Sequence, residues 1–428
     1  MNKLSRWKHS GILILVTVAA ARLGAQDTTH TRRDSLVSAL KDLQARLDAL
    51  EQKVSDATEN GVHTRSGIRM ELTGRVLVQG FGNSRRVNNV DDPQFVRPDS
   101  AADVSQRGGG MSVRQTLIAF RVSSPDVAGA QFAGDLQTDF FGGQMPSSGG
   151  RTFPLLRMRI AKGTLRWSHS ELMVGQDVPI IAPINPTSVL ASGTPDFAAA
   201  GNLWLWLPQA RLTLGGMNPN TAALQLGVLA PTSGDPAASF DTDLDPAERS
   251  GRPYLQARGR YRWEMSGRPG EAGCGGHLGW LSLAGSATVP RTTVTSNALA
   301  CDLVAPFGIF ELRGEAYTGQ RLRGLGGAAI GQGVTTAAPQ MRNVGAWGQL
   351  NVAPSPIWSF GLGGGVDDPR DDDVPANGRI KNDAFALYFT THPSGPLLLS
   401  AEWRRLLTKY QPGMKMADHF NLGFGFEF

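Results

Sequence analysis

The chain contains 428 residues, with 42 Lys and Arg against 37 Asp and Glu and a formal net charge of +5. Four of the basic residues and no acidic residue lie among the first 25 residues, so the rest of the chain is close to neutral and its charge does not favour nucleic acid as a partner. After the amino-terminal segment, no apolar run approaches the roughly 18 residues of a transmembrane helix, which excludes a helical membrane protein.

Residues 1–25 have the organisation of a secretory signal peptide. Three basic residues precede an apolar run at residues 11–21, and small residues at 24–25 offer a cleavage point. The run is too short to span a bilayer, and an uncleaved membrane anchor is the alternative interpretation. The pattern predicts that the mature chain is exported.

Residues 26–66 carry a heptad pattern that predicts a short coiled coil. Apolar residues recur at alternating spacings of four and three and are flanked by charged residues. We expect this segment to lie in the periplasm and to support oligomerisation; the alternative is an amphipathic helix that packs on its own domain. The seam consists of Leu36, Leu40, Leu43, Leu47, Leu50 and Val54.

From residue 68 onward the hydrophobic period changes to two, which is the period of a β-strand. Segments with one apolar and one polar face recur between stretches rich in turn residues. We predict sixteen strands, at about 68–82, 112–123, 131–141, 154–167, 171–177, 209–216, 221–230, 253–263, 276–287, 298–306, 309–318, 342–352, 357–366, 383–391, 397–406 and 418–428.

The connections alternate between tight turns and long segments, as they do in outer-membrane barrels. One exception is expected, because 264–275 falls on the short-turn side yet reads as a long connection. An open sheet edge is not tolerated in lipid, so strand sixteen must pair with strand one. The sequence therefore predicts an all-β fold, a 16-stranded antiparallel transmembrane β-barrel over residues 67–428, preceded by the coiled-coil helix; a soluble β-sandwich or propeller is the alternative.

The last strand alternates large apolar residues with small or polar ones and ends on an aromatic residue. We expect its aromatic face to contact outer-membrane lipid. Phe424, Phe426 and Phe428 also resemble the signal by which the outer-membrane assembly machinery recognises its clients, which would be a transient partner.

Residues 172–214 carry the most specific local motif, which consists of Gly175, Gln176, Asp196, Phe197, Pro208, Gln209 and Arg211. In this stretch and in its general organisation the chain resembles trimeric porins of the DcaP-like type, related to the phosphate-selective porins. The resemblance implies a homotrimer in the outer membrane of a Gram-negative-type bacterium and a loop at about 178–208 that folds into the barrel. The chain departs from the family at 177–179, where an aromatic residue often follows the Gly-Gln pair.

A barrel of sixteen strands encloses an aqueous channel, so its function depends on the charges that line it. By strand parity, the lining residues are Arg157, Arg159, Arg211, Arg258, Arg260, Arg262, Asp135, Asp139, Glu311, Arg313, Glu315, Glu402 and Arg404. The apolar content of the 178–208 connection predicts a constriction loop, whose expected residues are Asp177, Asp196, Phe197, Trp204 and Trp206.

A basic wall would favour small anionic solutes, because arginine matches planar carboxylates and phosphates. The sequence therefore predicts a porin that forms a diffusion channel for small hydrophilic solutes, with a weak preference for anions. Two alternatives stay open. The arginines can pair with acidic residues as a structural lattice, or the protein can be a structural or surface-binding barrel whose lumen is plugged.

Cys274 and Cys301 are the two cysteines of an exported chain. Antiparallel partners share a constant index sum, which can place the two opposite each other across a hairpin. A disulfide is favoured over two free thiols, and a metal site would need more ligands than His277 provides. The sequence has no G-x-S-x-G elbow, phosphate loop or H-E-x-x-H motif, so we expect neither enzymatic activity nor a cofactor.

Overall fold

The chain divides into two compact units, Met1–Val62 and His63–Phe428, and the second contains the barrel. The predicted signal peptide and the seam of the predicted coiled coil lie outside the described residues. The computed structural model describes residues 62–63, 68–99, 107–142, 154–216, 218–232, 244–285, 288, 290–327, 334, 336, 339–411 and 413–428.

The described residues form eighteen strands and three short 3-10 helices. The strands are β1 (Val62–His63), β2 (Arg69–Asn83), β3 (Gly108–Ser112), β4 (Leu117–Val127), β5 (Ala130–Asp139), β6 (Arg157–Arg166), β7 (Ser170–Asp177), β8 (Leu207–Gly215), β9 (Thr221–Leu229), β10 (Tyr254–Met265), β11 (Arg268–Leu283), β12 (Thr292–Phe307), β13 (Phe310–Gln320), β14 (Arg342–Ser355), β15 (Trp358–Pro369), β16 (Arg379–Thr391), β17 (Leu397–Tyr410) and β18 (Gly413–Glu427). The 3-10 helices are η1 (Glu248–Ser250), η2 (Leu322–Leu325) and η3 (Asp371–Asp373).

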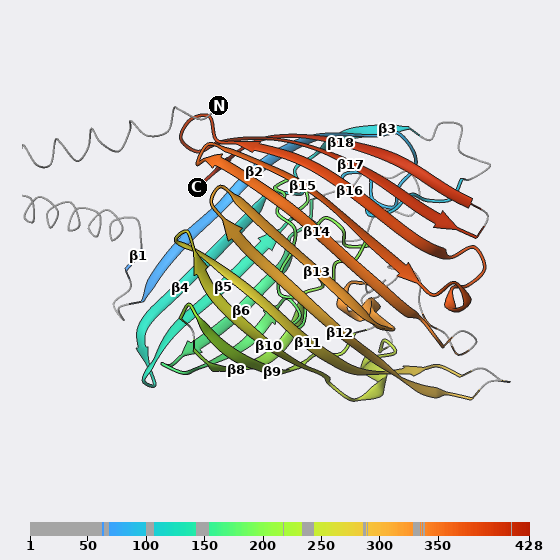
Figure 1. Cartoon of the computed structure of the whole chain (residues 1–428), viewed down its shortest axis with the longest axis horizontal. Coiled ribbons are helices and arrows are strands. Elements are labelled where there is room, and N and C mark those ends of the chain that lie inside the picture. The colour runs from blue at the N-terminus through green and yellow to red at the C-terminus, as the bar shows by residue number, and fades with distance from the viewer. Residues whose placement is uncertain are drawn as a thin grey trace, which may run out of the picture. The chain divides into compact units, whose positions relative to one another are not determined.

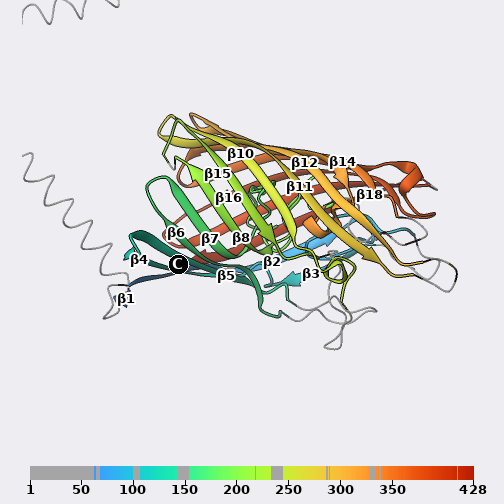
Figure 2. The ribbon, with the colours of Figure 1, turned by 90° about the horizontal axis from the view of Figure 1, so that it is seen from below.

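Apart from the two-residue β1, the strands occupy sixteen positions that close into an antiparallel barrel. β3 and β4 both pair with β2, at residues 79–83 and 69–75, so together they occupy one position. The last strand, β18, pairs with β2 and closes the sheet. Figures 1 and 2 show the neighbouring strands slanted in a common direction around the wall. This confirms the all-β, 16-stranded barrel predicted from the alternation.

One end of the barrel carries short turns and the other carries most of the long loops. Three of the long loops are L1 (residues 84–107), L3 (residues 178–206) and L6 (residues 321–341). The prediction of a long connection at 264–275 is wrong, since β10 and β11 are joined by Ser266 and Gly267 alone. Both residues have positive φ, 54° and 69°, as a type I′ hairpin turn requires.

The barrel wall has an apolar outer face. In β18, Phe420 and Leu422 are 58% and 67% exposed, whereas His419 and Asn421 between them are buried. The same alternation continues around the barrel and leaves large apolar side chains on its outside, as expected of a surface that contacts lipid. No helix in the described part of the chain has the length and apolar character needed to cross a membrane.

Candidate functional site

The long connection L3 lies inside the barrel and bonds to inward-facing side chains around the wall. The backbone N–H of Ile180 donates to Gln256 Oε1 of β10 at 2.7 Å, and that of Thr187 donates to Gln349 Oε1 of β14 at 2.8 Å. Farther along L3, the carbonyl oxygen of residue 199 accepts a hydrogen bond from Asn382 of β16 at 2.9 Å. Polar side chains of the wall therefore satisfy the backbone of a loop that carries few polar side chains of its own.

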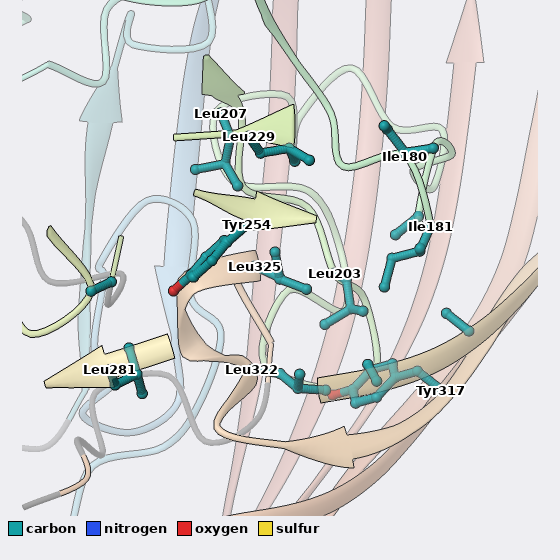
Figure 3. Packing of buried hydrophobic residues seen from close by; sticks show 14 of the residues in the cluster. Ile180, Ile181, Leu203, Leu207, Leu229, Tyr254, Leu281, Tyr317, Leu322 and Leu325 are labelled. Carbon is teal, nitrogen blue, oxygen red and sulfur yellow. The ribbon is translucent and has the colours of Figure 1, made fainter. Parts of the chain in front are cut away.

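Apolar contacts hold L3 against a second loop. Ile180, Ile181 and Leu203 of L3 pack in one buried cluster with Leu322 and Leu325 of L6 (Figure 3). The backbone N–H of residue 205 donates to the carbonyl oxygen of Leu325 at 3.1 Å. Because these apolar side chains are buried, L3 can be more apolar than a loop that extends into solvent.

The expected constriction residues are spread along L3 and its ends. Phe197 is buried and stacks on Trp347 of β14, with ring centroids 6.2 Å apart. Trp204 and Trp206 meet edge to face at 5.2 Å. Asp196, the residue before Phe197, contacts Arg404 of β17.

Asp177, the last residue of β7, lies between two positive side chains. Its carboxylate Oδ2 is 2.8 Å from Nζ of Lys162 and also contacts Nη2 of Arg211. One acidic group therefore offsets part of two positive charges where L3 begins.

The arginines of β10 form an ion-pair lattice with Asp302 and Glu271, which is buried at Arg258 and partly exposed at Arg262. Arg258 Nε donates to Asp302 at 2.8 Å, and its Nη2 donates to Glu271 at 2.8 Å. Arg260 and Arg262 also contact Glu271, at 3.1 Å and 2.6 Å. These arginines are therefore paired, but with Glu271 and Asp302 and not with Asp135 and Asp139, the partners considered from the sequence.

Two cavities lie against the inner wall near this lattice and have a positive excess. Their volumes are about 640 and 660 Å³, and they share Lys162, Glu171 and Arg211. The charged residues that line them are eight basic and four acidic ones: Arg69, Arg121, Lys162, Arg166, Arg211, Arg258, Arg260 and Arg262 against Asp135, Glu171, Asp177 and Glu271. Even if each of the four acidic residues neutralises one basic residue, the lining keeps a net positive charge.

This interior belongs to a barrel architecture with solved examples. The outer membrane channel DcaP of Acinetobacter baumannii aligns with a TM-score of 0.63 and 15% identity, over 86% of this chain and 99% of that chain. The chain has the fold of the outer-membrane porins. The anion-selective porin from Comamonas acidovorans aligns with a TM-score of 0.54 and 13% identity, over 84% and 100% of the two chains. OprB of Pseudomonas putida follows with 0.51 and 10%, over 87% and 96%. No protein-family model and no curated protein matches the chain.

A β-bulge in the porin barrel decides which basic residues of β6 face inward. The register between β5 and β6 shifts near Arg159. Arg157 and Arg159 both face Asp139, with N–O distances of 2.6 and 3.6 Å. Beyond the bulge the parity is reversed, so Lys162 faces inward and binds Asp177. The sequence prediction assumed an unbroken alternation along this strand and therefore missed Lys162.

The remaining predicted lining residues of the porin barrel lie beneath loops or beside them. Glu315 is buried and accepts a hydrogen bond from the backbone N–H of Leu203 at 3.2 Å. Arg313 contacts Glu311 at 2.9 Å and donates to a carbonyl oxygen of L3. On β17, Glu402 and Arg404 are buried under the same loop. Asp135 pairs with Arg121 at 3.0 Å.

The two cysteines lie on the outer face of the porin barrel. Cys274 of β11 and Cys301 of β12 are register partners and are joined by a disulfide, the pairing favoured by the sequence spacing. Phe424, Phe426 and Phe428 are exposed near the short-turn end. Among the described residues, no group of three His, Cys, Asp or Glu side chains is arranged to hold a metal ion.

Proposed function

We propose that the protein is an outer-membrane porin that forms a water-filled diffusion channel for small hydrophilic solutes and prefers small anions such as carboxylates and phosphate. The observation that carries this proposal is the positive excess around the two interior cavities. A cleft lined by one sign of charge concentrates ions of the opposite sign, and guanidinium groups match planar oxyanions. The likeness to the anion-selective porin from Comamonas acidovorans supports the same preference.

In this proposal the protein lies in the outer membrane of a Gram-negative-type bacterium, with the short-turn end of the barrel toward the periplasm. The apolar outer face supports contact with outer-membrane lipid. Residues 1–25 act as an export signal, and residues 26–66 form a periplasmic coiled coil that helps a homotrimer assemble, as the heptad pattern suggests. The terminal aromatic residues bind the assembly machinery transiently. The proposed role involves neither catalysis nor a cofactor.

A second candidate function is a structural or surface-binding barrel with a plugged lumen. The path of L3 favours it, because this loop bonds to β10, β14 and β16 and packs on L6. The two candidates differ in whether the folded protein conducts ions.

Reversal potentials in planar bilayers under a salt gradient test the anion preference. Lys162→Gln and Arg262→Gln together remove two partly exposed positive charges from the cavity lining. We expect the wild type to prefer chloride over potassium and the double variant to lose roughly two- to fivefold of that ratio, since a unit charge at about 4 Å in water contributes about 1 kcal/mol.

Arg405→Gln is the matched control for this experiment. Arg405 pairs with Asp418 on the outer face of β17 and β18, so its loss changes the charge without changing the lining. A wild-type protein without anion preference, or an equal effect of the control, would contradict the proposed role of the basic lining.

A further inference from the structure

One buried arginine holds three carboxylates and joins two interior loops to the barrel wall. Arg404 of β17 has Nη1 at 2.9 Å from Asp92 of L1 and Nε at 2.8 Å from Asp196 of L3. Its Nε also lies 2.6 Å from Glu402 of the same strand. The arginine side chain is 2% exposed and the three acidic side chains are fully buried. We call these four residues the Arg404 cluster.

The Arg404 cluster also connects the two loops to each other. The backbone N–H of Thr194 in L3 donates to Oδ2 of Asp92 in L1 at 2.9 Å. Ser188 of L3 donates its hydroxyl hydrogen to Glu402. Gln115, just before β4, donates to Asp92 at 3.3 Å and to the carbonyl oxygen of residue 190 at 2.9 Å. The Arg404 cluster is thus one of the attachments of L3 to the wall and to L1.

The charges of the Arg404 cluster do not balance. Three ionised carboxylates against one guanidinium would leave two uncompensated negative charges in a buried place, which is costly. The other titratable or charged groups that face the cluster are Asp91 with its partner Arg114 at 2.9 Å, His419 on β18 and Tyr388 on β16. The Asp91–Arg114 pair is neutral as a unit, so it does not cancel the excess.

Of the three acidic residues of the Arg404 cluster, Asp196 has the fewest hydrogen bonds to its carboxylate. Neither of its carboxylate oxygens has a hydrogen-bond partner among the described residues, although one lies against Arg404. Burial raises the pKa of Asp196 well above its ordinary value, against the opposing effect of Arg404. Burial likewise raises the pKa of Asp92 to about 6. Docking of the loops therefore shifts both carboxyl groups toward the protonated form.

We propose that the Arg404 cluster is a proton-dependent latch that holds L1 and L3 inside the barrel while carboxyl groups of the cluster are protonated and loosens L3 when they ionise. The sign follows from linkage: an acid whose pKa is higher in the docked state binds protons on docking, so docking is strongest at low pH. For Asp92 it weakens as the pH rises from about 4 to about 6, and the raised pKa of Asp196 acts in the same direction. A change in conductance additionally rests on the proposed porin function.

Hydrogen–deuterium exchange of the full-length protein in detergent tests the latch without requiring conduction. After correction for intrinsic exchange rates, we expect protection of residues 187–202 to be lower at pH 8 than at pH 5, by up to about tenfold per pH unit for each proton released. Asp196→Asn mimics the protonated acid, so it should remove most of this pH response and keep the loop protected at pH 8. Unchanged wild-type protection between the two pH values would overturn the proposal.

Controls separate the latch from general loosening of the loops. Asp99→Asn removes the acidic partner of Arg85 from an exposed ion pair of L1 and leaves the charges that face the Arg404 cluster unchanged, so it should retain the pH response. If Asp196→Asn does not fold, as judged by heat-modifiable migration, Asp92→Asn provides the same test from L1. A full pH response in either folded Asp→Asn variant of the cluster would refute the latch.

Conductance at the same two pH values gives the functional readout. We expect higher wild-type conductance at pH 8 than at pH 5 and a ratio close to one in Asp196→Asn. A channel that is silent at both pH values, with exchange that still responds to pH, would support the latch and overturn the porin function instead.

Discussion

At the scale of single residues, burial decides what each interior ion pair contributes. Arg258 and Asp302 are both about 1% exposed, whereas the Arg121 side chain is 65% exposed and its partner Asp135 is 20% exposed. Removal of one partner from a buried pair leaves an uncompensated charge, but an exposed pair is largely replaced by water. The two pairs have the same chemistry and differ mainly in solvent access.

We therefore expect Arg258→Ala to lower the free energy of unfolding by about 3–5 kcal/mol and Arg121→Ala by less than about 1 kcal/mol. Denaturant unfolding, followed by the loss of heat-modifiable migration, measures both. Equal destabilisation by the two substitutions would show that burial does not separate these pairs.

Asp177 provides a second test at this scale, because it offsets the charges of Lys162 and Arg211 at the cavity lining. Asp177→Asn keeps the shape and removes the negative charge. The chloride-to-potassium permeability ratio should rise by up to about fivefold, because a unit charge at about 4 Å in water contributes about 1 kcal/mol. An unchanged ratio would mean that the carboxylate does not act on the permeating ions, and a ratio that falls would contradict the prediction outright.

Sequence parity predicted many of these lining residues but missed Lys162 and the acidic residue Glu271. Lys162 was missed because a bulge reverses the parity of β6, and a bulge has no clear signature in one sequence. Glu271 was missed because residues 264–275 were predicted to form a long connection and not part of a strand. The Ser266–Gly267 dipeptide is a turn signal, and a two-residue turn there pairs Arg262 with Glu271 in register.

At the scale of elements, alternation predicted all sixteen strand positions, and the largest boundary error is the start of β11. Residues 268–275 are rich in Gly and Pro, which disfavour strands when read alone. In the barrel their backbone pairs with β10 along the whole segment, and the glycines leave room for the large Arg258 side chain across the strands. Pairing with neighbouring strands overrides local propensity here.

The disulfide between β11 and β12 permits a prediction about this hairpin. Cys274 and Cys301 are 27 residues apart, and a cross-link of that span stabilises a fold by about 3 kcal/mol when chain entropy dominates. Replacement of both cysteines by Ala should lower the denaturant midpoint without changing the conductance. A midpoint equal to that of the wild type would indicate that strand pairing alone fixes the hairpin.

At the scale of the whole molecule, the fold follows from an apolar exterior and a closed sheet, and both are readable from the sequence. The path of L3 is not, because its anchors are distant in the chain. Thr187 bonds to Gln349, 162 residues away, and Asp92 to Arg404, 312 residues away. Glutamine and acidic residues on inward-facing positions have no local pattern that names their partners. The resemblance to porins implied an inward loop, but the contacts come from the structure.

In the proposed function the barrel conducts although two loops fill part of its interior. Single-channel recording of the refolded, heat-modifiable protein in planar bilayers decides whether it does. We expect stepwise ohmic conductance, in groups of three if the trimer forms. A correctly folded barrel that stays silent at every pH would contradict the porin function and favour the plugged, structural barrel.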